Sequence, residues 1–341
     1  MVDLTTTELA AVGDAMTAAG VRLAGPLHAQ QIAGGRSNLT FRLTDGRDRW
    51  VLRTAPRAGR TPSAHDVARE FRVTRALRDT AVPVPPAVVL VEDEAALGAP
   101  YAVAGFVDGA CVQSRADLDA LDDATVAQCV DRLVDTLAQL HAVDPVAAGL
   151  EGHGRPDGYA ERQVRRWSGQ WELVGTEPLD ALATETGRLL AASLPDQRSS
   201  GIVHGDYRID NTILRLDGDV QVAAVVDWEL STLGDPVADV ALMCVYRHPA
   251  LDLVLGAPSA WTSDRLPDPA ALAAAYEAAG GVPLEAWDFH LALGYFKLAV
   301  IAAGIDHRYR AGATHGPGFD TAGAAVGPLL EAGRALLGGS R

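Results

Sequence analysis

The stretch HGDYRIDN at residues 204–211, together with the apolar run VAAVV at 222–226 and the Asp227 that follows, decides how this sequence folds. It supplies Asp206, Asn211 five residues later, and Asp227 beyond a short predicted hairpin. Carboxylate and amide oxygens are the hard ligands that Mg²⁺ prefers. The apolar run predicts a buried strand that delivers the last carboxylate rigidly to a cleft. An ordinary Asp/Asn-rich turn is the plainer alternative, and this flanking strand argues against it.

These residue types at this spacing predict phosphoryl transfer. That reaction needs phosphate charge bridged by a metal ion, while an acceptor hydroxyl is aligned with the leaving oxygen. We expect Asp206 to be the catalytic residue that orients the hydroxyl and accepts its proton. We expect Asn211 and Asp227 to be the metal ligands, holding the Mg²⁺ of a Mg²⁺-nucleotide.

Composition limits the other classes of function. The chain has 341 residues and 48% hydrophobic content, enough for one large domain or two lobes with a buried core. Its three cysteines are too few and too scattered for a disulfide framework, which favours a reducing, cytoplasmic location. The N-terminus has no signal-peptide pattern, and the run 291–305 is short for a bilayer and contains Lys297. We therefore expect a cytoplasmic protein with no membrane partner.

Charge is unevenly distributed along the chain. Residues 1–105 hold 12 basic and 11 acidic side chains, whereas residues 106–341 hold 17 and 33. An acidic surface repels nucleic acid, so we expect no nucleic acid partner. Lys297 is the only lysine, and the other 28 basic residues are arginines. Genomic base composition is the simplest explanation of that bias.

The order of predicted elements indicates two parts. Residues 26–107 alternate as strands around a turn at Asp45-Gly46, with one helix that Ser63 can cap and further strands at 87–91 and 101–107. From Asp117 onward the pattern is mainly helical, including segments near 269–280, 285–308 and 320–337. Asp235 is expected to cap a helix that has Pro236 in its first turn. The hinge is expected at Asp108-Gly109, which separates an N-lobe (1–107) from a C-lobe (108–341).

Three long motifs carry a family resemblance: AGGRSNLT at 33–40, HGDYRIDN at 204–211 and VDWELSTLGDP at 226–236. With them the chain resembles the aminoglycoside phosphotransferase and choline kinase-like family, relatives of protein kinases. It most resembles the branch found both alone in bacteria and fused to acyl-CoA dehydrogenases. The resemblance covers most of the chain. It implies an α+β, bilobal, protein kinase-like fold: a small antiparallel-sheet N-lobe with one helix, a larger, mostly helical C-lobe, and ATP bound between them.

The resemblance assigns further residues to the site. His204 is expected to fix the catalytic loop, either as a structural histidine or with a direct chemical role. Arg208 stands where kinase-like enzymes often place a cation near the transferring phosphate, although a salt-bridged arginine is equally compatible. In the first motif, backbone N–H groups can approach phosphates where side chains are absent. The expected nucleotide-binding residues of this motif are Gly34, Gly35, Arg36, Ser37 and Asn38.

One position departs from the kinase pattern. Kinases pair a strand lysine with a helix glutamate to hold the nucleotide phosphates, and the residue matching that lysine here is Arg53. A guanidinium can bind phosphate and pair with Glu70, but its size and fork geometry differ from those of an ammonium. A purely structural salt bridge between strand and helix is the alternative reading of Arg53 and Glu70.

The sequence therefore predicts an enzyme that uses Mg²⁺ and ATP to phosphorylate a hydroxyl of a small molecule. The acceptor site is expected over the late helices, with aromatic candidates that can equally be core residues: Trp287, Phe289, Tyr295, Phe296, His307 and Tyr309. If the cluster 306–310 faces the cleft, its basic groups favour an anionic acceptor. The resemblance to the dehydrogenase-linked branch slightly favours a hydroxylated acid or acyl thioester over an aminoglycoside or macrolide. A nucleotide-binding regulatory pseudokinase is the alternative, motivated by Arg53. A protein kinase is disfavoured because Trp-Glu, not Phe-Gly, follows Asp227. Oligomeric state is not indicated.

Overall fold

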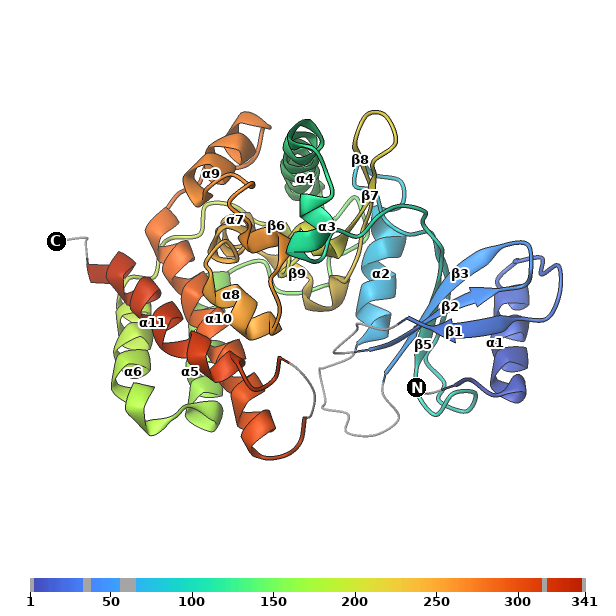
Figure 1. Cartoon of the computed structure of the whole chain (residues 1–341), viewed down its shortest axis with the longest axis horizontal. Helices are drawn as coiled ribbons and strands as arrows, with labels where there is room; N and C mark the ends of the chain where they lie inside the picture. Colours follow the sequence, from blue (N-terminus) through green and yellow to red (C-terminus); the bar gives the residue numbers. More distant parts are fainter. Residues whose placement is uncertain (1–2, 33–37, 56–65, 315–317, 339–341) are drawn as a thin grey trace.

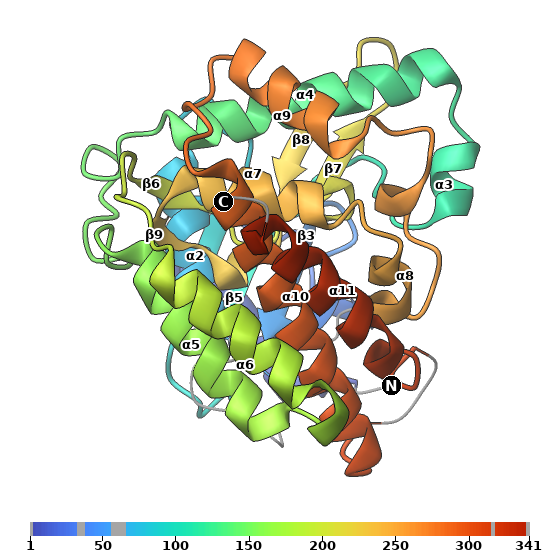
Figure 2. The ribbon, with the colours of Figure 1, turned by 90° about the vertical axis from the view of Figure 1, so that its left-hand side faces the viewer.

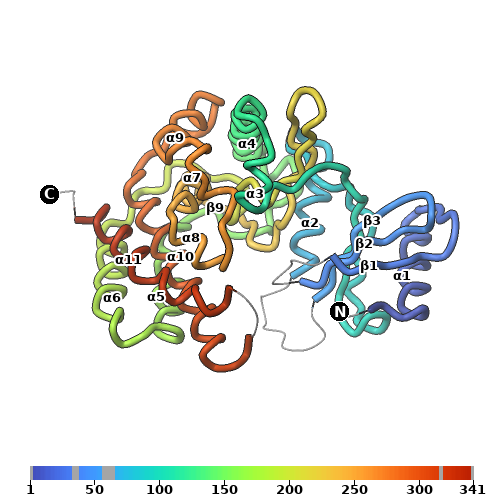
Figure 3. Tube along the Cα trace, in the orientation of Figure 1, coloured from blue at the N-terminus to red at the C-terminus, as the bar shows by residue number. Residues whose placement is uncertain are grey.

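The structure, a computed structural model, describes residues 3–32, 38–55, 66–314 and 318–338. Figure 1 shows two parts side by side: a sheet with helix α1 at one end of the molecule, and a larger, mainly helical part at the other. Helix α2 lies where the two parts meet, and the tube in Figure 3 shows the same arrangement. The α+β composition predicted from the sequence is confirmed.

The first part is built on a five-stranded antiparallel sheet in the order β1-β2-β3-β5-β4. Its strands are β1 (His28–Gln31), β2 (Leu39–Thr44), β3 (Arg49–Thr54), β4 (Ala87–Val91) and β5 (Tyr101–Gly105). The β2–β3 turn forms because the Asp45 carboxylate accepts hydrogen bonds from the backbone N–H groups of Arg47 and Asp48. These bonds lower the pKa of Asp45 to about 2, together with a larger contribution from the N–H of Ala24.

Strand alternation decides which face of the sheet each side chain of β3 occupies. Trp50 and Leu52 are buried in the cluster that also contains Phe41 and Leu43. Because successive side chains of a strand point to opposite faces, Arg53 lies on the other face of the sheet. Its strand neighbours, Thr40 on β2 and Ala102 on β5, hold it in the middle of the sheet. The cation is therefore placed by a rigid element.

Among the described residues, two helices accompany the sheet, one more than expected. Helix α1 (Thr6–Ala18) begins with a capping box between Thr5 and Glu8 and buries Val12 and Met16 against the sheet. Helix α2 (Val67–Leu77) is capped by Asp66, whose carboxylate accepts from the N–H of Arg69 at 2.9 Å. The expected cap, Ser63, lies outside the described residues, and the prediction that it caps this helix is wrong.

The second part combines helices with two short antiparallel strand pairs. Its helices are α3 (Arg115–Asp119), α4 (Asp123–His141), α5 (Tyr159–Val174), α6 (Glu177–Ala192), α7 (Pro236–Val245), α8 (Ala250–Leu255), α9 (Pro269–Ala278), α10 (Trp287–Arg310) and α11 (Ala322–Gly338). Strand β6 (Gly201–Val203) pairs with β9 (Thr232–Gly234), and β7 (Thr212–Arg215) pairs with β8 (Gln221–Val225). Figure 2 shows α5 and α6 side by side, with α10 and α11 packed along them.

The expected late helices are confirmed to within a few residues, and so is the cap of α7. Asp235 accepts from the N–H of Val237 at 3.1 Å, with Pro236 in the first turn. Helix α10 is, by length and composition alone, apolar enough to cross a membrane, which the shorter run seen in the sequence was not. In this structure 72% of its apolar window is buried inside the protein, as expected for the central helix of a core.

Two separate hydrophobic clusters hold the molecule together. The smaller contains residues of α1 and the sheet, and the larger contains the helical part. Val73 and Leu77 of α2 belong to the larger cluster, although α2 lies between strands of the sheet in the sequence. The core of the second part therefore extends across the expected lobe boundary through one helix.

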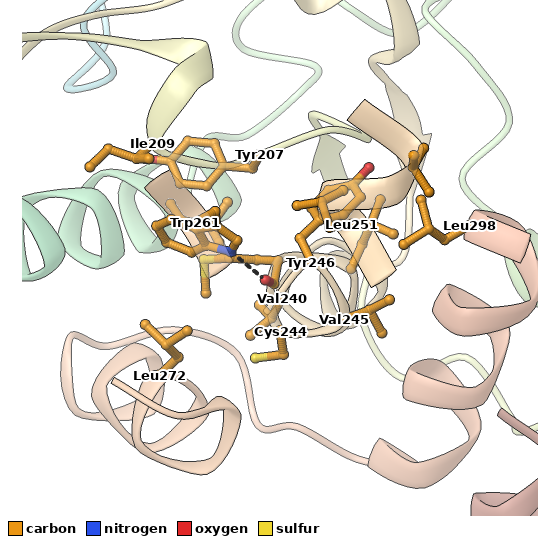
Figure 4. Packing of buried hydrophobic residues seen from close by; sticks show 14 of the residues in the cluster. Tyr207, Ile209, Val240, Cys244, Val245, Tyr246, Leu251, Trp261, Leu272 and Leu298 are labelled. Atoms are coloured by element: carbon orange, nitrogen blue, oxygen red, sulfur yellow. Dashed lines mark hydrogen bonds between the residues drawn. The ribbon is translucent and has the colours of Figure 1, made fainter. Parts of the chain in front are cut away.

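The larger cluster also anchors the stretch that decided the fold. Figure 4 shows Tyr207 and Ile209 close to Trp261, whose indole N–H donates to the Met243 carbonyl at 2.9 Å. The Tyr207 hydroxyl donates to the carbonyl of Leu133 at 2.8 Å. Burying these two side chains fixes the loop between β6 and β7, while Asp206, Arg208 and Asp210 of the loop stay partly exposed.

Candidate active site

The catalytic loop, residues 204–211, joins β6 to β7 and is held by hydrogen bonds to Asp239 of α7. The Asp239 carboxylate accepts from the backbone N–H groups of His204 at 2.5 Å and Gly205 at 2.7 Å. Burial opposes its ionisation, but hydrogen bonds and the nearby histidines His141 and His204 outweigh burial and lower its pKa. Asp239 is thus an internal brace of the catalytic loop.

Gly205 can be only glycine at this turn. Its φ is +84°, and a Cβ there would lie 2.8 Å from the carbonyl oxygen of Leu230. A side chain would therefore meet both an unfavourable backbone conformation and a backbone clash. The close approach brings the segment after Asp227 against the residue that precedes Asp206.

The structure brings Asp206 and Asn211 into direct contact. The Asn211 amide donates to the Asp206 backbone carbonyl at 2.7 Å and to its carboxylate at 2.9 Å. The backbone carbonyl of Asn211 in turn accepts from the N–H of Val226 at 2.9 Å, next to Asp227. One loop and the end of one strand therefore place all three predicted oxygen-bearing side chains at the same edge.

Asp227 has an unusual backbone. It follows β8 with φ 66° and ψ 57°, the left-handed region, which is uncommon for a residue other than glycine. Such conformations cluster at functional sites, where the surrounding structure enforces them. Its side chain keeps 35% exposure and faces Arg53, whose guanidinium lies 3.3 Å from the carboxylate. The strand thus delivers a carboxylate to an accessible edge.

Arg53 of β3 and Glu70 of α2 form the predicted ion pair, with 2.6 Å between guanidinium and carboxylate. Burial works against the charge of Arg53, but Glu70, Asp227 and Glu229 together raise its pKa. Burial raises the pKa of Glu70 to about 7, against the opposing effect of Arg53. The guanidinium therefore links a carboxylate of the helix to the carboxylate at the end of β8.

Asp206 is surrounded by positive and hydrogen-bonding groups. Burial would raise its pKa, but Arg208, a hydrogen bond from the Tyr246 hydroxyl, His204 and Lys297 outweigh it and lower the pKa. A carboxylate held ionised is able to accept a proton or orient a hydroxyl. Tyr246 was not anticipated from the sequence, because nothing in residues 236–246 distinguishes it from a core tyrosine.

The side chains of Arg208 and His204 both contact neighbouring polar groups. The Arg208 guanidinium lies 2.7 Å from the Asp210 carboxylate and 3.4 Å from that of Asp206, and only 12% of its side chain is exposed. His204 is fully buried: Nε2 lies 3.0 Å from the Val226 carbonyl, and Nδ1 accepts from the N–H of Asp206. These contacts favour the loop-fixing role of His204 over direct chemistry.

The glycine-rich motif is only partly visible. Gly34, Gly35, Arg36 and Ser37 lie outside the described residues, so their predicted contact with nucleotide stays a prediction. Asn38 is buried, and its amide lies 3.5 Å from the Glu229 carboxylate, a long and weak contact. Glu229 was not anticipated, although the Trp-Glu pair after Asp227 was noted as a departure from protein kinases.

The late helices separate the aromatic candidates into two groups. Phe289 and Phe296 are buried in the larger cluster, with Trp287 and Tyr295 packed against it. His307 and Tyr309 lie on the exposed end of α10, where Arg310 pairs with Asp306 at 2.8 Å. The first four are therefore core residues, which was the alternative given for them.

The cavities do not outline a nucleotide site. Among the described residues a groove of about 1000 Å³ lies between α2 and residues 139–153, behind the helix that carries Glu70. It is lined by four arginines of the α2 region and lies away from Asp206.

The donor set fits Mg²⁺ bound together with a nucleotide. The described residues hold no group of three or more His, Cys, Asp or Glu side chains that could bind a metal by themselves. Mg²⁺ usually takes one or two carboxylates and completes its shell with water and substrate phosphates. An amide and a carboxylate at one strand edge match that pattern, whereas a structural zinc site would need four protein ligands.

Solved structures with this architecture are kinase-like phosphotransferases. One, a Ralstonia eutropha protein provisionally described as an aminoglycoside phosphotransferase, superposes with a TM-score of 0.81 at 31% identity, over 96% of this chain and 98% of its own. The aminoglycoside phosphotransferase APH(4)-Ia, solved with AMP-PNP and hygromycin B, gives a TM-score of 0.61 at 17% identity, over 93% and 96% of the two chains. The second likeness shows the fold alone, and it is the predicted bilobal one.

The chain belongs to the phosphotransferase enzyme family, whose family model matches residues 28–293. Curated relatives are acyl-CoA dehydrogenase family member 11 of Gallus gallus, 35% identical over 92% of this chain, and that of Homo sapiens, 33% identical over 90%. The matches cover 41% and 39% of those relatives, so this chain spans about two fifths of their length. The resemblance inferred from the three motifs is confirmed.

Proposed function

We propose that this protein transfers the γ-phosphate of ATP, with Mg²⁺, to a hydroxyl group of a small molecule. The observation that carries the proposal is the bond between Asn211 and Asp206, with the Asn211 backbone paired to Val226. The next residue, Asp227, contacts Arg53 of the Arg53–Glu70 pair. Phosphoryl transfer is catalysed almost entirely by positioning and charge stabilisation, and these side chains supply both.

Each residue has a distinct task in this proposal. Asp206 stays ionised because its pKa is lowered, and its carboxylate, held by Asn211 and Tyr246, orients the acceptor hydroxyl and takes up its proton. Asn211 and Asp227 would hold Mg²⁺, which when bound neutralises charge on the phosphates. Arg53, kept in place by Glu70, binds the α- and β-phosphates.

We propose that the nucleotide lies between the lobe of residues 1–107 and that of residues 108–341. We also propose that the protein acts in the cytoplasm. Related proteins support a nucleotide: APH(4)-Ia was solved with AMP-PNP, and an aminoglycoside 2'-phosphotransferase was solved with GDP. We propose ATP and not GTP because the family that the three motifs resemble implies ATP.

For the acceptor we slightly prefer a hydroxylated acid or an acyl thioester. The support is the similarity to proteins named acyl-CoA dehydrogenase family members, which cover 85–92% of this chain. The basic groups at the exposed end of α10, His307 to Arg310, would favour a carboxylate or phosphate on the acceptor. Aminoglycosides and macrolides remain the other candidates, since structural neighbours act on these antibiotics.

A second candidate is a regulatory nucleotide-binding protein without turnover. One observation favours it: the Arg53 guanidinium lies 3.3 Å from the Asp227 carboxylate. Mg²⁺ would have to compete with this guanidinium for the carboxylate. A lysine ammonium is a compact point charge, so it could bind one phosphate without a second N–H group that also contacts Asp227, as the arginine does.

ATP turnover separates the two candidates. Purified protein would be assayed with Mg²⁺ and ATP alone, and then with hydroxylated acids, their acyl-CoA thioesters, aminoglycosides and macrolides. Acceptor-dependent ADP formation, lost in Asp206→Asn, supports the enzyme. Nucleotide binding by calorimetry with no turnover on any acceptor supports the regulatory candidate, and absence of nucleotide binding contradicts both.

A further inference from the structure

Lys297 lies in the middle of α10 and differs in residue type from every other Lys or Arg position of the chain. The chain uses arginine at 28 of its 29 basic positions, and this is the exception. In the sequence it lies 92 residues after Gly205. In the structure its ammonium donates to the backbone carbonyl of Gly205 at 2.9 Å, directly before Asp206.

The environment of Lys297 is a costly one for a cation. Burial lowers its pKa, and the nearby Arg166 acts in the same direction, while Asp206 and Asp239 favour the charged form. The ammonium lies 5.9 Å from the ring centroid of Trp167 on α5. A buried ammonium is retained when its charge and hydrogen bonds are satisfied by specific partners. Here those partners are the catalytic loop and its brace.

The peptide group between Gly205 and Asp206 is held at both ends. Its carbonyl accepts from Lys297 at 2.9 Å, and its N–H donates to Nδ1 of His204 at 3.2 Å. The preceding peptide is held by the Asp239 carboxylate through the N–H of Gly205. Because the side chain of Asp206 leaves the backbone at this peptide, its orientation decides where the carboxylate can reach.

We propose that Lys297 is a positioning residue for catalysis: by holding the Gly205 carbonyl, it orients the peptide that carries Asp206 toward the acceptor hydroxyl. The inference rests on the proposed function, in which Asp206 is the catalytic base. A guanidinium is larger and planar, so we expect it to shift the loop if it replaces the ammonium. That difference explains why a chain otherwise built with arginine has lysine at this position.

The test compares Lys297→Met, Lys297→Arg and the matched control Val300→Ala. Val300 is a fully buried apolar residue of the same helix, so its truncation costs packing without removing a contact to the loop. Lys297→Met should lower kcat about 100-fold, as expected for a misplaced catalytic group, with little change in KM for ATP. Lys297→Arg should recover part of the loss, and Val300→Ala should keep kcat within about twofold at a similar or larger fall in Tm.

A second measurement does not depend on turnover. Backbone hydrogen exchange of residues 201–211 should be faster in Lys297→Met than in Val300→Ala, since only the first frees the Gly205 carbonyl. Equal exchange in the two variants, or a Lys297→Met enzyme with wild-type kcat, overturns the inference. If the wild type turns over no acceptor while exchange still separates the variants, the proposed function fails but the hold of Lys297 on the loop stands.

Discussion

The two hydrophobic clusters contribute to the site in different ways. The cluster of α1 and the sheet supports one cation, Arg53, on a central strand. The larger cluster supports the loop 204–211, the strand end at Asp227 and, through Val73 and Leu77, the helix that carries Glu70. The Arg53–Glu70 and Arg53–Asp227 contacts therefore join groups anchored in two cores, and the site depends on how these cores are placed relative to each other.

The largest expected effect comes from the side chain at the centre of the loop. Asp206→Asn should lower kcat by about 10²–10⁴-fold, the usual contribution of a general base. Steady-state kinetics should show little change in KM for ATP. The exposed Asp217→Asn, on the turn between β7 and β8, makes the same chemical change away from the site and should leave kcat unaltered. Wild-type activity in Asp206→Asn would contradict the assigned role.

Two variants on strand β3 test the contact between the two cores. Arg53→Met leaves Glu70 largely buried without its partner and should destabilise the protein by about 3 kcal/mol in urea unfolding, the low end for buried pairs because both side chains keep some exposure. Arg49→Met, on the same strand, removes an exposed pair with Asp108 and should cost about 0–1 kcal/mol. Adding Glu70→Gln to Arg53→Met should restore much of the loss. Equal costs for the two single variants would show that Arg53–Glu70 behaves as a surface pair.

The independence of the two clusters is tested by truncating one leucine in each. Leu43→Ala in the sheet and Leu133→Ala in α4 should each cost about 2–5 kcal/mol, since both side chains are fully buried. Hydrogen exchange should accelerate mainly in residues 39–54 for the first variant and mainly in α4 for the second. If either variant accelerated exchange equally in both parts, the molecule would unfold as one unit.

The smallest effect is expected behind α2. His153 lies beside Arg69, its Nε2 3.0 Å from the Ser231 hydroxyl, and burial with Arg69 lowers its pKa to about 4. The unfolded chain binds a proton near pH 6.5 and the folded chain does not, so this contribution to stability is complete above pH 6.5 and is lost as the pH falls toward 4. Urea unfolding between pH 7.5 and 5 should show a smaller loss of stability in His153→Gln than in the wild type. The same loss in both proteins would mean that His153 does not contribute to it.

Much of the molecule could be predicted from local pattern. The alternation around Asp45-Gly46 predicted β2 and β3, and the apolar run before Asp227 predicted β8, because strand periodicity and turn chemistry are written in neighbouring residues. Helix α1 and the cap Asp66 were missed. A capping box is present at Thr5 and Glu8, but α1 is weakly amphipathic, and only packing on the sheet shows its role.

The sequence by itself determined the family, the two-part fold and the residue types of the site, since long motifs and short-range periodicity are properties of consecutive residues. Only the tertiary structure decided which distant side chains meet. Lys297 is 92 residues from the carbonyl it binds, Arg53 is 174 residues from Asp227, and Tyr246 reaches Asp206 from the end of α7. No local pattern encodes such contacts, because they arise from the way two cores and the helices between them pack.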